Sequence, residues 1–125
     1  MPYLFLILGP PRAPQEFSVL SVTAVSVTLS WISNFNGGSP QTFSVQYRTK
    51  GSEWPKMDQI SWIVDPGFQK NVTFEVKNLN QRTLYEFRCR AISNSHNEVK
   101  ISNYTKLALI HTKGKYSSIL SIPSL

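Results

Sequence analysis

Few side chains in this sequence could do covalent or acid–base chemistry. The one cysteine, Cys89, and the two histidines, His96 and His111, are the ready nucleophile and imidazoles. Cys89 is in phase with Tyr85 and Phe87 in an alternating stretch, which predicts a buried thiol with little thiolate character. No acidic residue is placed to orient either imidazole. We therefore predict no catalytic residue and a protein that is not an enzyme.

Metal and cofactor sites are not expected either. A zinc site needs four ligands, and two isolated histidines with one buried cysteine cannot supply them. The glycine-rich segment at residues 36–39 connects predicted strands instead of leading into a helix, so it lacks the form of a phosphate-binding loop. A single cysteine also excludes an intrachain disulfide. The prediction is no metal and no cofactor.

Two sequons could accept N-linked glycans, at Asn71-Val72-Thr73 and Asn103-Tyr104-Thr105. Both are predicted near strand beginnings and therefore exposed. A chain of this composition would contain about one or two sequons by chance, so their presence alone does not indicate secretion.

The chain is strongly basic. Thirteen Lys and Arg against seven Asp and Glu give a net charge of +6 and a pI near 9.7. Such a balance favours polyanionic partners or anionic surfaces, and it is also typical of solvated strand faces.

Short strands are predicted to position all of these residues. Polar and apolar residues alternate through most of the chain, and no helical period of useful length occurs. The predicted strands are residues 17–22, 25–31, 43–48, 60–64, 72–76, 85–91 and 106–112. In the second strand, Val25, Val27, Leu29 and Trp31 share the core face. This pattern predicts an all-β, seven-stranded antiparallel sandwich.

The turns between these strands also have a pattern. Leu79 precedes Tyr85 by six residues across a polar connector, which predicts a corner where the tyrosine ring fills the core and its hydroxyl reaches upstream backbone. Gly37 and Gly38 tolerate positive φ, and residues 65–67 form an Asp-Pro-Gly turn. The tip at residues 94–97 has asparagines that can supply positive φ.

In its ordered motifs the chain resembles a fibronectin type III domain over residues 11–114, with immunoglobulin-like topology. The residues that carry the resemblance are Pro11 and Pro14, Trp31, Gly37-Gly38-Ser39, Tyr47-Arg48, Leu79, Tyr85, Phe87, Ala91 and Thr112. The expected structural core contains Trp31, Tyr47, Leu79, Tyr85 and Phe87. The family usually has a glycine in the last hairpin where this chain has His96.

The resemblance implies a non-catalytic spacer and protein-interaction module of a cell-adhesion or receptor protein, extracellular or at the cell surface. The proline-rich entry and the Gly-Gly-Ser-Pro segment are similar to domains that follow immunoglobulin modules in adhesion receptors. The alternative is the same fold inside an intracellular scaffold or muscle protein. No Arg-Gly-Asp tripeptide and no Trp-Ser-x-Trp-Ser box occurs in the sequence.

Outside this domain, residues 1–10 are interpreted as a linker or the end of a preceding module, and residues 115–125 as a tail or linker. Residues 1–8 lack a positively charged start and a small-residue cleavage site, so they are not interpreted as a signal peptide.

The candidate partner surface is a basic stripe. The third and sixth strands share a sheet in this fold, so Gln46 and Arg48 should face outward beside Arg88 and Arg90. Acidic Glu86 interrupts the stripe. Two interpretations remain: a surface for an acidic protein patch or a sulfated polysaccharide, or a solvated sheet face. No groove-entering helix is predicted, so nucleic acid is not an expected partner.

Two apolar groups have ambiguous roles. Trp54 and Trp62 could cover the core edge or anchor an interface. If Ala108 and Ile110 face inward, then Leu107 and Leu109 face outward beside Ile92 and form an apolar patch, an assignment that a one-residue bulge would reverse.

Overall fold

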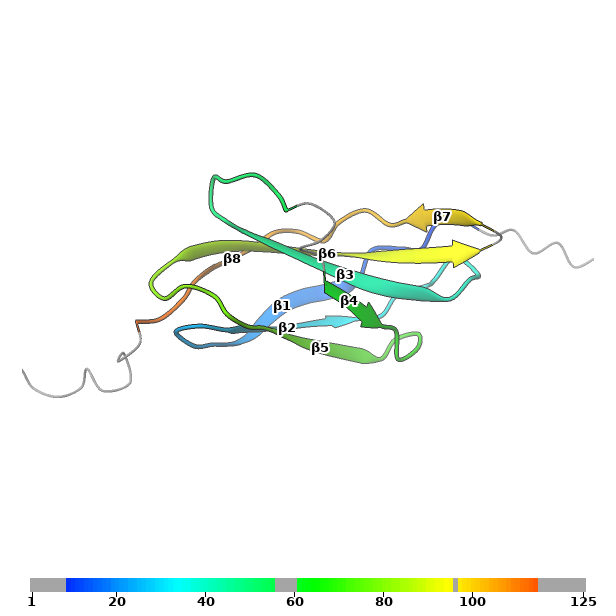
Figure 1. Cartoon of the computed structure of the whole chain (residues 1–125). Helices are drawn as coiled ribbons and strands as arrows, with labels where there is room; N and C mark the ends of the chain where they lie inside the picture. Colours follow the sequence, from blue (N-terminus) through cyan, green and yellow to red (C-terminus); the bar gives the residue numbers. More distant parts are fainter. Residues whose placement is uncertain (1–8, 56–60, 96, 115–125) are drawn as a thin grey trace, which may run out of the picture.

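Two antiparallel sheets stack face to face in the computed structural model, which describes residues 9–55, 61–95 and 97–114 (Figure 1). The first sheet has the order β1-β2-β5, with β1 at Gln15–Val22, β2 at Val27–Ile32 and β5 at Asn71–Val76. The second has the order β4-β3-β6-β7, with β4 at Ser61–Val64, β3 at Gln41–Thr49, β6 at Leu84–Ser95 and β7 at Glu98–Ile101. Strand β8, at Ala108–His111, also pairs with β6. The predicted all-β antiparallel sandwich is confirmed.

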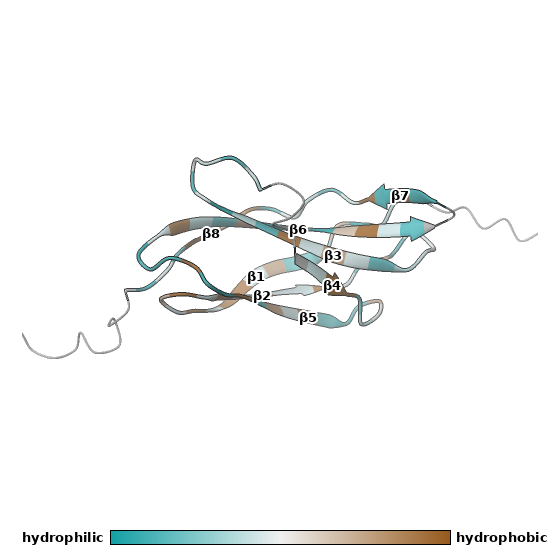
Figure 2. Ribbon diagram, in the orientation of Figure 1, coloured by the Kyte–Doolittle hydropathy of each residue, from teal (hydrophilic) through white to brown (hydrophobic). Residues whose placement is uncertain are grey.

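Alternating residues build the core between the sheets. Figure 2 shows apolar and polar segments alternating along the strands. In β2, Val27, Leu29 and Trp31 are fully buried, and the Trp31 ring meets Phe43 of the opposite sheet edge-on, with centroids 5.6 Å apart. Phe87 is fully buried beside half-buried Tyr47. Apolar burial of this kind is the main stabilising contribution to such a sandwich.

The prediction that Val25 belongs to this core face is wrong. Strand β2 begins at Val27, and residues 23–26 form a turn in which the Ser26 N–H donates to Thr23 Oγ1 at 2.9 Å. The turn breaks the alternation, so Val25 is half exposed and Ser26 is buried in its place.

A tyrosine corner joins the two sheets before β6. The Asn80 N–H donates to the Tyr85 hydroxyl at 2.8 Å, as the sequence predicted, and Leu79 is buried. Thr112 fixes the corner from the other side, since its hydroxyl donates to Asn80 O at 2.6 Å and accepts from the Thr83 N–H at 2.9 Å. The buried polar groups of the corner are therefore paired.

The last predicted strand, residues 106–112, corresponds to β8, and a further short strand precedes it. Strand β7, which the sequence analysis missed, pairs with Ile92–Ser95, and β8 pairs with Leu84–Phe87. Between them, hydroxyls replace backbone acceptors: Ser102 Oγ accepts from the Ala91 N–H at 2.8 Å and Thr105 Oγ1 from the Cys89 N–H at 3.1 Å. The main chain between β7 and β8 can therefore depart from regular strand pairing while these N–H groups of β6 remain hydrogen-bonded.

The hairpin before β7 turns at Asn97, which has a positive φ of 63°. This residue supplies the conformation that the sequence analysis assigned to the asparagines of the tip. His96 lies outside the described residues.

The proline-rich lead-in is attached to the domain. The Gly9 N–H donates to Gly37 O at 3.0 Å and the Arg12 N–H to Phe35 O at 2.9 Å. Gly37 has a φ of 79°, and a Cβ there would lie 2.8 Å from Pro10 O. The lead-in and the exit after β8 lie at opposite ends of the sandwich (Figure 1). The direction in which the chain enters is therefore set by contacts that only glycine permits.

We expect Gly37→Ala to lower the free energy of unfolding by about 2–4 kcal/mol, because it combines positive-φ strain with a clash against the lead-in. The matched control is Gly51→Ala, since Gly51 has a φ of 87° and open space around its Cβ position. This control should cost about 1 kcal/mol. Urea unfolding measures both values, and amide exchange at Gly9 and Arg12 should accelerate only in Gly37→Ala. Equal costs would show that the lead-in is not held by this contact.

Candidate interaction surface

The register of β3 against β6 brings three arginines to the outer face of the second sheet. Arg90 pairs with Ser44, Arg88 with Gln46, and Arg48 with Glu86. Each side chain on this face is two residues from the next along its strand, so the guanidinium groups form one row.

Two aromatic rings lie between these guanidinium groups. Arg48 Cζ is 4.1 Å and Arg88 Cζ 3.8 Å from the centroid of Trp54. Arg88 Cζ is also 3.7 Å from the centroid of Tyr104, and Arg90 Cζ is 4.7 Å from it. These five residues, in the order Arg48, Trp54, Arg88, Tyr104 and Arg90, are called the arginine–aromatic ladder below. Its cation–π contacts hold the 50–55 loop and the 102–107 segment against the sheet.

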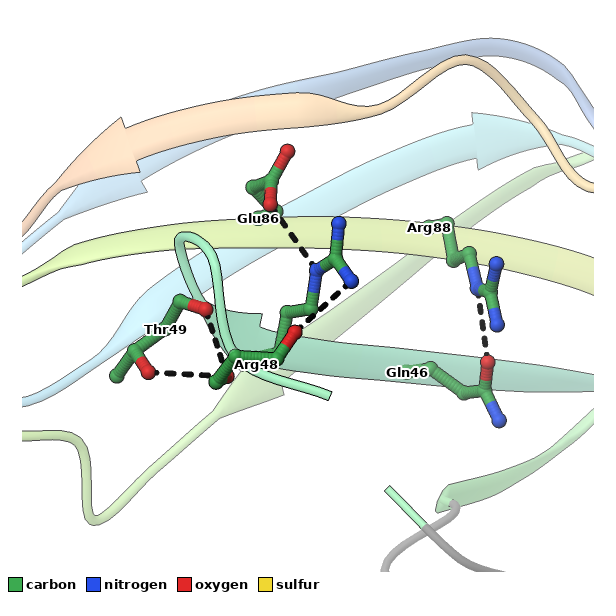
Figure 3. A network of polar contacts seen from close by, with 6 residues as sticks. Gln46, Arg48, Thr49, Glu86 and Arg88 are labelled. Atoms are coloured by element: carbon green, nitrogen blue, oxygen red, sulfur yellow. Dashed lines mark hydrogen bonds and ion pairs between the residues drawn. The ribbon is translucent and has the colours of Figure 1, made fainter. Parts of the chain in front are cut away.

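Hydrogen bonds fix two arginines of the ladder in place. Arg48 Nε donates to Glu86 Oε1 at 3.0 Å, and Arg88 Nε donates to Gln46 Oε1 at 2.8 Å (Figure 3). Arg48 also donates to the carbonyl oxygen of Ser52 at 2.9 Å. Glu86 therefore neutralises the positive charge of Arg48 within the domain.

The prediction that Gln46 faces outward beside Arg88 is confirmed. The Gln46 side chain points to the outer face, but only 4% of the residue is exposed. The cause is the ladder, because Arg88 bonds to Gln46 and stacks on Trp54 above the sheet. Burial of the Arg88 guanidinium lowers its pKa from the usual value, the interaction with Tyr104 opposes this, and the charges of Arg90 and Arg48 add to the lowering. An arginine remains charged at neutral pH despite such a shift.

Arg90 has fewer partners than the other two arginines. Its Nε atom is buried and makes no hydrogen bond within the described residues, and the same holds for Ser44 Oγ beside it. No carboxylate of the described part of the chain forms an ion pair with Arg90. Arg88 likewise has no carboxylate partner among these residues, but its Nε donates to Gln46 Oε1, whereas Arg90 Nε has no acceptor.

Apolar side chains lie around the ladder. Trp62, on edge strand β4, is half exposed, whereas Trp54 is part of the ladder. Leu107 and Leu109 face outward and are half exposed, while Ala108 and Ile110 pack against the core, which is one of the two arrangements that the sequence left open.

The expectation that Ile92 adjoins these leucines is wrong. Leu109 pairs with Glu86, whereas Ile92 pairs with Ile101 near the other end of β6. The additional strand β7 causes this difference, because β7 and β8 pair with separate parts of β6.

The two sequon asparagines are exposed. Asn71 is the first residue of β5, and Asn103 lies in the segment between β7 and β8, five residues before β8 begins. Asn103 is adjacent to Tyr104 of the ladder, so a glycan there would lie beside this surface.

The candidate nucleophile and imidazole are apart. Cys89 is fully buried, and burial raises its thiol pKa well above the ordinary range. His111 is exposed on β8, with Nδ1 2.9 Å from Thr112 O. No group of three or more potential metal ligands occurs among the described residues. Nor does a helix of a length and apolarity suited to crossing a membrane occur in the described ranges.

This chain belongs to the fibronectin type III domain family, whose pattern it matches over residues 12–106. It is 36% identical over 87 residues to the Xenopus laevis protein "Cell adhesion molecule-related/down-regulated by oncogenes" and 31% identical over 90 residues to human "Brother of CDO". Each alignment covers 69% of this chain but only 6% and 8% of the respective relative.

A solved structure described as "Myokine structure" superposes with a TM-score of 0.62 at 19% identity, over 83% of this chain and 99% of that one. This likeness supports the fold alone. The Xenopus laevis relative is cell adhesion molecule-related by name, so an adhesion or receptor module is the class of protein that the family and this relative support.

We expect Tyr104→Leu to lower the free energy of unfolding by about 1–2 kcal/mol, since it removes the ring that separates Arg88 from Arg90. Tyr104→Phe is the matched control, because it keeps the ring and should cost less than about 0.5 kcal/mol. Chemical unfolding monitored by tryptophan fluorescence gives both values. Equal losses in the two variants would show that the stacked ring contributes nothing beyond its hydroxyl.

Proposed function

We propose that this domain is a non-catalytic protein-interaction and spacer module in the extracellular part of a cell-adhesion or receptor protein. The observation that carries the proposal is the outer face of the second sheet, where arginines and aromatic rings lie beside exposed apolar residues. Arginine and aromatic side chains are enriched in protein interfaces. The names of the relatives add support, since both describe adhesion-related proteins or their kin.

The spacer role is supported by the ends of the sandwich. The chain enters at one end and leaves at the other (Figure 1), and the lead-in is hydrogen-bonded to the domain. A chain that spans less than a tenth of its relatives' length has the size of one module in a longer array. A fixed entry direction would transmit the orientation of a preceding module.

The absence of catalysis is supported by the burial of Cys89 and its raised thiol pKa, because a protonated, inaccessible thiol is a poor nucleophile.

The alternative, a module of an intracellular scaffold or muscle protein, has a direct test. We expect mass spectrometry of the protein from its native source to find a glycan on Asn71 or Asn103, because both are exposed and N-glycans are added in the secretory pathway. Asn71→Gln and Asn103→Gln are the controls that assign the mass increase. Failure of a membrane-impermeant reagent to label the full-length protein on intact cells would contradict the extracellular proposal.

Besides a protein partner, we propose a sulfated polysaccharide as a ligand of the arginine–aromatic ladder. The net charge of +6 supports this proposal. Because Glu86 neutralises Arg48, we expect Arg90→Gln to lower the salt concentration that elutes the domain from heparin more than Arg48→Gln does. A combined Arg48, Arg88 and Arg90 to Gln variant should elute earliest. Unchanged elution of that triple variant would show that the basic stripe is a solvated sheet face instead.

A further inference from the structure

A row of apolar side chains crosses the outer face of the second sheet from edge to edge. The register pairs Val64 with Thr42, Thr42 with Ile92, and Ile92 with Ile101. Val64 is 78% exposed and Ile101 47% exposed, while Ile92 between them is only 7% exposed. Four strands at about 4.8 Å spacing make the row roughly 14 Å wide. Within this row, Thr42 on β3 is polar, and the residues on β4, β6 and β7 are apolar.

Further apolar residues extend this row. Trp62 is half exposed and lies two residues from Val64 on β4, and Val99 is exposed two residues from Ile101 on β7. Figure 2 shows the hydrophobic end of β4 at this edge. The apolar row is defined here as Trp62, Val64, Ile92, Val99 and Ile101. Contiguous exposed apolar residues of this kind mark interaction sites more often than isolated ones.

The apolar row ends at Arg90, the ladder arginine whose Nε atom has no hydrogen-bond acceptor among the described residues. Trp62 pairs with Ser44, and Ser44 pairs with Arg90, so these three residues form the next row across the sheet. Arg90 Nε and Ser44 Oγ are both buried and have no hydrogen-bond partner within the described residues. A buried donor left unpaired is unfavourable, and a carboxylate is its strongest acceptor.

We propose that the apolar row and Arg90 together bind an acidic, apolar-containing segment of another protein. A carboxylate of that segment accepts hydrogen bonds from the Arg90 guanidinium, and an apolar side chain packs on Ile92 between Val64 and Ile101. Arg90 and Ile92 are two residues apart on one face of β6, about 7 Å, so an extended partner would present the acidic and apolar residues at positions i and i+2. The proposal rests on the protein-interaction function proposed above.

Charge selects this occupant over two others. A second copy of this chain would bring a second +6 domain and a second uncompensated Arg90 to the same face, which is repulsive. A sulfated polysaccharide would engage Arg90 but has no group that packs on Val64 and Ile101. An acidic segment with an apolar residue matches both parts of the surface.

Selection from a random twelve-residue peptide library displayed on phage tests the proposal on the isolated domain. Enriched peptides should carry Asp or Glu two positions from an aliphatic or aromatic residue. Their affinity should fall at least tenfold in Arg90→Gln and in the neutral double variant Val64→Ser/Ile101→Ser. Lys77→Gln, one residue beyond β5, and Leu20→Ser, on β1, are the matched controls at the other sheet. Both residues are exposed, and both variants should leave the affinity unchanged. Thermal unfolding shows whether every variant folds.

A charge exchange separates the proposed contact from loss of folding. Arg90→Glu should abolish binding of a selected peptide. The same peptide with its acidic residue replaced by Arg should bind to Arg90→Glu. Peptides that bind Arg90→Gln and Val64→Ser/Ile101→Ser as well as the original domain would overturn the proposal, and so would a selection that enriches none.

Two further outcomes would also overturn the proposal. Heparin could displace the peptides at the same concentration from the Val64→Ser/Ile101→Ser variant and from the original domain. That result would assign Arg90 to the polysaccharide. Concentration-dependent dimerisation lost in Val64→Ser/Ile101→Ser would assign the row to a second copy. Because these measurements use the isolated domain, they are independent of the glycan and surface-labelling results that test the extracellular function.

Discussion

The antiparallel pairing of β3 with β6 is the constraint on which the rest of the structure depends. It aligns Phe43, Val45 and Tyr47 with Ala91, Cys89 and Phe87 on the inner face, and Ser44, Gln46 and Arg48 with Arg90, Arg88 and Glu86 on the outer face. A slip of one residue would move every side chain to the opposite face, placing arginines in the core and aromatic rings in water. The tyrosine corner prevents this slip, because the Tyr85 hydroxyl is bonded to Asn80 before β6 begins its long pairing.

The outer face is ordered by a second set of contacts that depends on the first. Side chains at the centre of a sandwich sheet are ordinarily solvated when they face outward, yet Ser44 and Gln46 are nearly inaccessible here. The arginine–aromatic ladder provides the cover, and its Tyr104 lies in the segment between β7 and β8. Ser102 and Thr105 satisfy the backbone of β6 with their hydroxyls, which frees Tyr104 to stack between Arg88 and Arg90.

The alternation of residue types was sufficient to predict the strands, the corner and the inward positions of β6, because a period of two and a leucine–tyrosine spacing are local signals. The alternation failed where regular strand pairing is interrupted. Val25 is in phase with β2 in the sequence, but the Thr23–Ser26 turn removes it from the strand. Strand β7 has only four residues and mixed polarity, which is too short for its period to be distinguished from a loop.

The candidate surface was predictable only in part. The register alone placed Arg48, Arg88 and Arg90 on one face, but their differing accessibility depends on residues distant in sequence: Glu86 for Arg48, and Trp54 and Tyr104 for the stack. The apolar row likewise depends on pairing across four strands, because Val64, Ile92 and Ile101 belong to three different strands, β4, β6 and β7.

The two parts of the outer face therefore differ in how they are held. At the end near β8, the ladder residues are paired to one another, so their charges and rings are largely used within the domain. Near β7, the Arg90 Nε atom has no hydrogen-bond acceptor among the described residues, and Val64, Val99 and Ile101 of the apolar row are exposed. Groups already bonded within a fold gain little from a partner, whereas an unpaired cation beside exposed apolar residues gains both a hydrogen-bond acceptor and burial. Binding energy on this sheet should consequently concentrate at the β4 and β7 edges, with the ladder serving as the rigid base that holds Arg90 in position.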